Sequence, residues 1–164
     1  MRIYRIYTKK GDTGLTDGPG GRLEKSKEVF ELLGTIDETQ AAIGVAYEYT
    51  ESKVYKEQLQ KIMQELYKVS AAVYKQKDID NYDLAKDMEN WMDEMDETLP
   101  RITRFILPIG SKASAHCHLA RTVSRRLERN FVKEPTVKNF GNILIFLNRL
   151  SDYLFVLARK LEEK

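Results

Sequence analysis

Three arginines recur at four-residue spacing in the segment 121–129 of the chain. At about 100° per residue, Arg121, Arg125 and Arg129 form one stripe along a helix. Guanidinium groups bind phosphate through forked, bidentate hydrogen bonds, so the stripe is a candidate polyanion site. The alternative is a solvated helix face with surface ion pairs. The apolar residues predicted to lie on the opposite, core-facing side are Leu119, Val123, Leu127 and Phe131.

The amino-terminal run TKKGDTGLT, residues 8–16, combines glycines, hydroxyls and two adjacent lysines. Glycine lets backbone N–H groups converge on an anion and lysine adds a mobile charge, which is the composition of a phosphate-binding loop. The run is not a Walker A loop, which requires GxxxxGK followed by Ser or Thr, and it lacks the GxGxxG of a dinucleotide fold. An ordinary flexible terminus is the alternative interpretation.

A carboxylate, Asp37, lies in the first helical segment on a stripe whose other members are apolar or small: Leu33, Ala41 and Gly44. A carboxylate on such a face points toward a packed partner. Because burial of an unpaired carboxylate is costly, an arginine is its natural companion, either within the chain or across a subunit contact. The alternative is that Asp37 is a favourable charge near a helix start.

One amide, Asn148, lies on the polar side of the last helical segment, on a stripe with Asp152, Phe155 and Arg159. An amide offers both a donor and an acceptor, so Asn148 could bind an adenine edge or a ribose hydroxyl. An exposed Asn148 beside a surface network from Asp152 to Arg159 is the alternative interpretation.

The sequence gives no support for a metal centre built by the protein. His116, Cys117 and His118 are adjacent and lack the separated second half of a zinc site. Di-iron bundles need Glu-x-x-His on two helices, and neither histidine has a glutamate three residues before it. A GxSxG nucleophile elbow is also missing.

The elements that must position these residues are predominantly helical. Five of the nine glycines fall within the first 21 residues, which indicates a loop there, and the long proline-free stretches beyond favour helices. Apolar residues at three- and four-residue spacing, as in 59–73 and 143–161, support this prediction. We expect helices at about 26–48, 53–76, 79–98, 112–132 and 139–162, forming an all-α five-helix bundle. Strand patterning is weak, the best case being Arg2 to Tyr7.

Composition excludes several classes of protein. The 164 residues, 42% hydrophobic and 32% charged, suit one compact domain, with residues 1–25 as a glycine-rich loop segment and 26–164 as the bundle. The net charge of +2 gives no chain-wide basic excess for nucleic acid or an acidic membrane. No uncharged apolar run approaches the roughly 18 residues of a membrane helix. The lone Cys117 and the absence of a signal peptide favour the cytoplasm.

Four ordered motifs spanning the chain from Tyr7 to Arg159 carry a resemblance. They are TKKGDTGLT, EVFELLGTIDET, FILPIGSKASAHCHLARTVSRRLER and FLNRLSDYLFVLAR. Together they resemble the ATP:cob(I)alamin adenosyltransferase family of five-helix bundles, which usually act as homotrimers. Members transfer the adenosyl group of ATP to the cobalt of a reduced corrinoid and release triphosphate, with the nucleotide bound between neighbouring subunits. The resemblance implies the same substrates, with Mg²⁺ accompanying ATP.

The resemblance also assigns roles by position. Seven residues match the family's nucleotide loop, the last of them reaching the phosphates: Thr8, Lys9, Lys10, Gly11, Thr16, Asp17 and Lys25. Three more fall where the family contacts ATP: Arg125, Glu128 and Arg129. Asn148 falls where the family holds the nucleoside.

Three further positions concern catalysis and the corrin. Asp37 matches an acidic residue that pairs with an arginine across the subunit contact, here Arg125. Phe105 occupies the place of an aromatic that packs under the corrin and helps to displace the lower axial ligand. An apolar surface there disfavours a polar ligand under cobalt, so we expect His118 to be structural rather than a cobalt ligand.

The implied reaction fits the physical interpretation of the residues. Cobalt attacks the 5′ carbon of ribose, so the departing triphosphate must be neutralised, and fixed cations stabilise such developing charge. The nucleophile is the metal, so the protein needs no general acid or base. A reductase that delivers the electron and an adenosylcobalamin-dependent enzyme that receives the product are the further partners implied.

Two departures from the family pattern concern the corrin side. The family usually has two small residues after LP where this chain has Ile109-Gly110-Ser111, and the chain ends at Lys164, without the extension that some members place over the corrin.

Two other functions remain as alternatives. A regulatory module would bind ATP without turnover. An RNA-binding protein that uses the 121–129 helix would show steep salt dependence, which the near-neutral charge disfavours.

Overall fold

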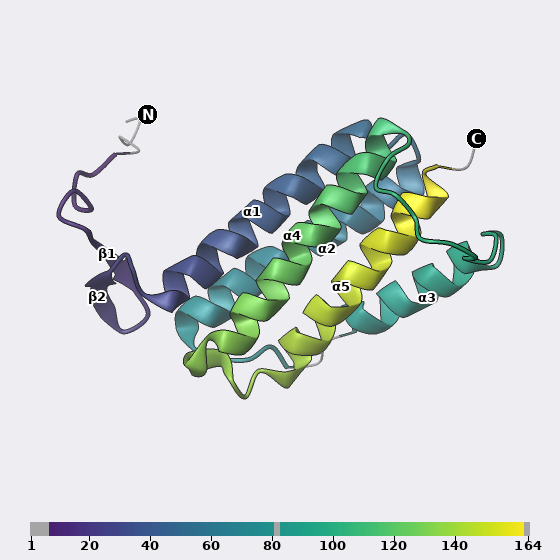
Figure 1. Ribbon diagram of the computed structural model, residues 1–164. Coiled ribbons are helices and arrows are strands. Elements are labelled where there is room, and N and C mark those ends of the chain that lie inside the picture. The colour runs from purple at the N-terminus through teal and green to yellow at the C-terminus, as the bar shows by residue number, and fades with distance from the viewer. Residues whose placement is uncertain (1–6, 81–82, 163–164) are drawn as a thin grey trace, which may run out of the picture.

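The computed structural model describes residues 7–80 and 83–162 and contains the predicted bundle of five α-helices. Figure 1 shows the long helices running side by side, with a shorter helix along one side of the bundle. The helices are α1 (Glu28–Tyr49), α2 (Lys53–Lys75), α3 (Leu84–Asp96), α4 (Lys112–Lys133) and α5 (Gly141–Lys160), with a short 3₁₀ helix η1 (Pro135–Val137) before α5. The predicted all-α class is confirmed.

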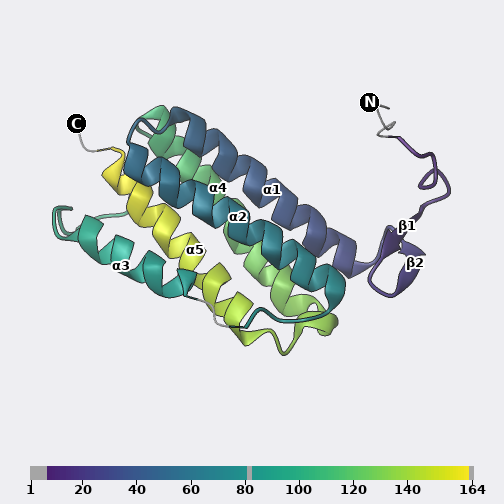
Figure 2. The same ribbon diagram turned by 180° about the vertical axis from the view of Figure 1, so that it is seen from behind.

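The core lies where α1, α2, α4 and α5 face one another. The helix α4 packs against both α1 and α5, and α2 lies beside α1, as Figure 2 shows. The apolar spacing predicted for α2 and α5 matches this core, because Leu59, Leu66, Leu147 and Leu154 are fully buried. The contacts between helices therefore fix which face of α4 is left for ligands.

The prediction for Leu119 is wrong. This side chain is 52% exposed, whereas Leu127 and Phe131 are buried as expected. The buried stripe of α4 instead passes through Cys117 and Ala120. At about 100° per residue, Leu119 is displaced by roughly 120° from Phe131 around the helix, so both cannot face the same core.

A β-hairpin that sequence patterning did not indicate precedes α1. The strands β1 (Leu15–Gly18) and β2 (Gly21–Glu24) pair antiparallel with Gly18 opposite Gly21, which leaves Pro19-Gly20 as the turn. Gly20 has φ +81°, the value required at the third position of a type II turn, and proline suits the second. Of the weak strand expected at Arg2 to Tyr7, all but Tyr7 lies outside the described residues.

The helix α3 begins five residues later than predicted. A backbone N–H at Ile79 donates to the side chain of Asp78 at 2.8 Å. Such a local bond competes with a helical turn, and it falls where the sequence predicted the helix to start. The other four helices begin and end within two residues of the predicted positions.

The helix α5 is the one described helix that could cross a membrane by length and composition, but 56% of its apolar window is buried inside the bundle. Apolar residues along α5 meet the other helices rather than forming a continuous outer face. This is the pattern of a core helix.

One buried hydrogen bond makes a stability prediction. The Tyr153 hydroxyl of α5 donates to Oε1 of Gln58 in α2 at 2.9 Å, and both residues are buried. Tyr153→Phe would leave that amide oxygen without its partner, so we expect a loss of about 1–3 kcal/mol in the free energy of unfolding, measured by urea titration. The control Tyr67→Phe changes an exposed side chain and should cost less than about 0.5 kcal/mol. Equal unfolding midpoints for the two variants would contradict this assignment.

Candidate nucleotide and corrinoid site

The residues predicted to bind phosphate form a folded loop that packs on the hairpin. The N–H of Asp12 donates to the carbonyl of Lys9, and that of Gly14 to the carbonyl of Gly11, so residues 9–14 make two successive turns. Lys9 takes φ +59°, and Gly14 takes φ +80°. The segment TKKGDTG is therefore an ordered pair of turns rather than an extended tail.

Lys25 lies directly over this loop. Its backbone N–H donates to the carbonyl of Gly14 at 2.9 Å. Its ammonium nitrogen, Nζ, lies 2.9 Å from the point where a Cβ would be if Gly11 had a side chain. The missing side chain at Gly11 is what lets the ammonium group approach the backbone. The structure thus brings Lys25 to the loop with which the sequence grouped it.

Arg22 is a residue that sequence reasoning missed. From β2 its guanidinium donates to the carbonyl of Lys10 at 2.6 Å and to that of Leu15 at 3.4 Å, and it lies 3.8 Å from the carboxylate of Asp17. Arg22 ties the loop to the hairpin. Its signal was obscured because the pairing of the two short strands was not anticipated.

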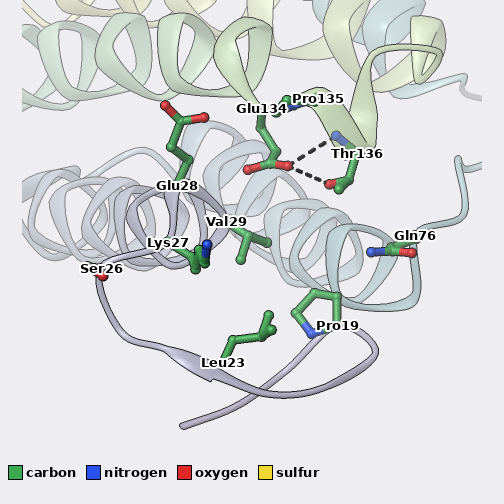
Figure 3. Close-up of a pocket in the computed structure, with 10 residues that line it drawn as sticks. All are labelled: Pro19, Leu23, Ser26, Lys27, Glu28, Val29, Gln76, Glu134, Pro135 and Thr136. Carbon is green, nitrogen blue, oxygen red and sulfur yellow. Dashed lines mark hydrogen bonds between the residues drawn. The ribbon is translucent and has the colours of Figure 1, made fainter. Parts of the chain in front are cut away.

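The hairpin in turn docks on the end of the bundle. A Cβ at Gly18 would lie 2.6 Å from the ring of Phe30 in α1, so hairpin and helix are in close contact there. Beside this contact, a cavity of about 410 Å³ lies between the hairpin and the bundle. Figure 3 shows Leu23 and Pro19 on one side of it and Glu134 on the other. The Glu134 carboxylate accepts from the N–H and the hydroxyl of Thr136.

The arginine stripe on α4 is divided by burial. Arg125 and Arg129 are exposed and make no hydrogen bond or ion pair with the described residues. Arg121 is half-buried, with its guanidinium 6.0 Å from the centre of the Phe155 ring and its Nε buried without a partner in the described chain. The neighbouring Arg126 forms an ion pair with Glu38 of α1. Two unpaired guanidinium groups therefore remain available to an anion.

Asn148 and Glu128 come together next to these arginines. The Nδ2 of Asn148 in α5 donates to Oε1 of Glu128 in α4 at 3.0 Å, and Arg149 donates to the Asn148 oxygen at 2.9 Å. Together with Arg125 and Arg129 these residues form a polar patch across two helices, here called the α4–α5 patch. The contact joins residues 20 positions apart that the sequence had assigned separately.

The phosphate loop and the α4–α5 patch do not meet within one chain. No hydrogen bond or ion pair given for the described residues joins loop residues 8–14 to the patch, and Figure 1 shows the amino-terminal segment extending away from the bundle. Asp37 is exposed on α1 and likewise has no ion pair with Arg125 in the described chain. Within the described chain, the loop and the patch therefore lie apart.

Phe105 lies at the other end of the molecule, in the loop that joins α3 to α4. Its ring is 86% exposed. Beside it, loop residues Ile106 and Ile109 and the helices α4 and α5 enclose a cavity of about 350 Å³ that includes His118. Arg159 binds Asp96 at 3.2 Å and the carbonyl of Pro100, so the alternative interpretation of a surface network from Asp152 to Arg159 has no support among the described residues.

Burial governs the two titratable groups at the centre of α4. Burial raises the pKa of the Cys117 thiol to about 12, so this residue stays protonated. Burial, with a smaller effect of Arg121, lowers the pKa of His118. No group of three His, Cys, Asp or Glu side chains in the described ranges could hold a metal ion.

Comparisons with known proteins agree on one family. The model of the cobalamin adenosyltransferase family matches residues 6–161. The corrinoid adenosyltransferase MMAB of Homo sapiens is 41% identical over 96% of this chain and 69% of its own length. A corrinoid adenosyltransferase of Bacillus subtilis is 36% identical over 94% of this chain and 85% of its own.

Solved structures give the same result. A PduO-type ATP:corrinoid adenosyltransferase from Lactobacillus reuteri, an alanine-for-phenylalanine variant complexed with cobalamin and ATP, superposes with a TM-score of 0.83 at 29% identity, covering 95% of this chain and 92% of that one. A lysine-for-arginine variant of that enzyme, complexed with ATP, also gives a TM-score of 0.83. The chain therefore belongs to the cobalamin adenosyltransferase family and is an ATP-dependent corrinoid adenosyltransferase.

Proposed function

We propose that the chain transfers the 5′-deoxyadenosyl group of ATP to cob(I)alamin, with the phosphate loop and the α4–α5 patch as its nucleotide site. The cobalt(I) centre supplies an electron pair to the 5′ carbon and becomes cobalt(III). A cobalt–carbon bond forms, the bond from that carbon to the phosphate oxygen breaks, and triphosphate leaves with that bond's electron pair. The observation that carries the proposal is that, in a chain of this family, the exposed guanidinium groups of Arg125 and Arg129 have no partner among the described residues.

The nucleotide half of the site consists of two cationic surfaces. The turns of residues 9–14 include Lys9 and Lys10, and Lys25 lies beside them. The backbone N–H groups of these turns, together with the hydroxyls of Thr8 and Thr16, suit phosphate oxygens. Asp17, bound to Arg22, keeps the loop in place on the hairpin. Arg125 and Arg129 bind the triphosphate, and the contact between Glu128 and Asn148 orients the amide that holds the nucleoside.

The two surfaces belong to neighbouring subunits of a homotrimer. A contact in which the loop of one subunit meets the patch of the next is head-to-tail, and such a contact closes into a ring when the rotation allows. Asp37 pairs with Arg125 across the same contact. The exposed apolar side chains of Val45 and Leu119 on α1 and α4 support this assembly, because a subunit contact would cover them.

The corrin half of the site is the region around Phe105. The exposed ring offers an apolar surface to the lower face of the corrin, which disfavours water or a polar ligand under cobalt. The two substituted positions in the Lactobacillus reuteri variants, a phenylalanine and an arginine, are 20 residues apart, as are Phe105 and Arg125. This shared spacing supports the assignment of both residues.

The reaction belongs in a reducing cytoplasm, where a reductase supplies cobalt(I) and an adenosylcobalamin-dependent enzyme takes the product. Mg²⁺ accompanies ATP rather than occupying a protein cage. The lone buried Cys117 is compatible with that compartment.

The direct test is anaerobic incubation of the protein with ATP and chemically reduced cobalamin. We expect the absorbance change of cobalt alkylation together with release of one triphosphate for each cobalt–carbon bond. ATP binding without alkylation would instead identify a regulatory module. RNA affinity that falls steeply with salt and ignores ATP would favour the basic-helix alternative.

Gly18→Ala tests whether the hairpin positions the phosphate loop. The new Cβ would contact the ring of Phe30, so the hairpin must shift, and we expect the KM for ATP to rise severalfold while the KM for cobalamin stays the same. Gly141→Ala, where a Cβ meets no atom within 4 Å, is the matched control. A normal KM for ATP in the Gly18 variant would show that the docking contact is not needed for nucleotide binding.

A further inference from the structure

The cavity beneath the Phe105 loop contains a buried polar group that the proposed mechanism leaves unused. His118 is 3% exposed and lines this space, and its Nδ1 is buried without a hydrogen-bond partner among residues 7–80 and 83–162. Burial lowers the pKa of the ring, so the imidazole is neutral near pH 7, with one donor and one acceptor. Buried donors and acceptors are expensive to leave unpaired, which indicates that a ligand completes this site.

The walls of the cavity are held in place by the end of α5. Arg159 donates to the carbonyl of Pro100 at 2.5 Å, and Nζ of Lys160 donates to the hydroxyl of Thr98 at 2.7 Å, so both residues bind the start of the loop. At the end of the loop, the N–H of Ser111 donates to Oε2 of Glu162 at 2.8 Å, and its hydroxyl donates to the Leu161 carbonyl at 3.0 Å. The loop that carries Phe105 is therefore fastened at both ends.

The segment Ile109-Gly110-Ser111, which departs from the family pattern, needs glycine at its centre because of the contact between the loop and Glu162. Gly110 has φ +138°, and a Cβ there would lie 1.6 Å from the Glu162 carboxylate. The bound carboxylate occupies the space of a side chain. Ile109, the residue before this glycine, lines the cavity and contributes to its apolar side.

The chemistry of the cavity suits a polar, amphipathic group. Arg104, Arg159 and Glu162 are its charged lining residues, and the last two are already bound to Pro100 and Ser111. Ile106, Ile109 and Ala158 supply apolar contacts, and His118 supplies a hydrogen-bonding end. A primary carboxamide on a short methylene arm matches both, because it has donors and an acceptor for a neutral imidazole and an apolar stem for the walls. The corrin ring carries such acetamide and propionamide arms around its edge, and a volume of about 350 Å³ accommodates one.

We propose that this cavity receives one carboxamide arm of the corrin ring and that His118 is its hydrogen-bond partner. The proposal rests on the proposed function, because Phe105, the proposed contact for the lower face of the corrin, lies in the loop whose residues Arg104 and Ile106 line the cavity. His118 then acts as a specificity residue for the corrinoid rather than as a cobalt ligand.

The test uses cobalamin and the set of its derivatives in which a single carboxamide is hydrolysed to a carboxylate. Equilibrium titration of the ATP complex and turnover are measured for the wild-type protein and for His118→Phe, which keeps an aromatic ring against Phe155. We expect His118→Phe to weaken cobalamin binding about tenfold and leave the KM for ATP unchanged. The wild type should discriminate against one derivative about tenfold, and His118→Phe should lose that discrimination.

Two further variants separate a hydrogen bond from a structural effect. His118→Gln can place an amide near the position of the ring nitrogens and should restore part of the discrimination. His116→Phe, whose ring stacks on Tyr49 outside the cavity, should leave it unchanged. The proposal is overturned if His118→Phe, with a wild-type melting temperature, discriminates among the derivatives as the wild type does. Selective binding without turnover in the wild type would overturn the proposed function alone.

Discussion

Arg125→Ala is expected to abolish measurable adenosyl transfer, with kcat/KM falling at least about a hundred- to a thousandfold. The guanidinium of Arg125 lies on the exposed face of α4 without a partner among the described residues, where it can follow the negative charge that develops on the departing triphosphate. Removing one donor that stabilises such charge typically lowers the rate by about a hundred- to a thousandfold. The measurement is the initial rate of cobalt alkylation under anaerobic conditions, with ATP varied at saturating cob(I)alamin.

Two variants serve as controls for this result. Lys133→Ala removes an exposed cation from the last turn of the same helix, outside the proposed site, and should leave the rate unchanged. Arg125→Lys keeps the charge but loses the bidentate geometry, so an intermediate rate is expected. Since the side chain is exposed, the circular dichroism spectrum and melting temperature of the alanine variant should match the wild type. A wild-type rate in Arg125→Ala would remove this residue from the mechanism.

Lys25→Ala should have the second largest effect, a loss of about a hundredfold in kcat/KM for ATP. The Lys25 ammonium lies over Gly11 and can contact a phosphate held by the turns of residues 9–14. A charged hydrogen bond that strengthens as the triphosphate leaves lowers kcat when it is lost, and its ground-state part raises the KM for ATP. Steady-state kinetics with ATP varied at saturating cob(I)alamin separate the two contributions.

Lys27→Ala is the matched control, because it removes an exposed lysine two residues further along, at the N-cap of α1. We expect its kinetic constants for ATP to change by less than a factor of about two, as for an exposed charge that touches no substrate. If the two lysine variants behaved alike, the specific contact between Lys25 and the phosphates would be refuted.

The helices could be predicted because residues close together in the sequence determine them. Apolar residues in α2 and α5 recur at helical spacing, and proline is confined to the connections. The hairpin could not be predicted in the same way, since its strands have four residues each and it depends on a type II turn at Pro19-Gly20 and on contact with Phe30. Leu119 was misplaced because a helix contacting two neighbours buries a stripe that winds around its axis.

The site follows the same division between local and long-range information. Arg125, Glu128 and Arg129 share a helix face, so their proximity is a consequence of helical geometry. The contact of Asn148 with Glu128 and the binding of Arg159 to the loop at Pro100 depend on how α5 packs, which no spacing rule contains. In the proposed homotrimer, the loop and the patch of one site belong to different chains, so no pattern within one chain could predict how they lie relative to each other.

The most direct test of a site shared between subunits is the activity of mixed trimers of Lys25→Ala and Arg125→Ala protomers. Each variant alone has one damaged half in every site. After exchange at equal concentrations, about a quarter of the sites in a ring of three should combine an intact loop from one protomer with an intact patch from its neighbour. The account predicts recovery of about a quarter of the wild-type rate. Trimers shown by native mass spectrometry to contain both variants, yet no more active than either alone, would contradict it.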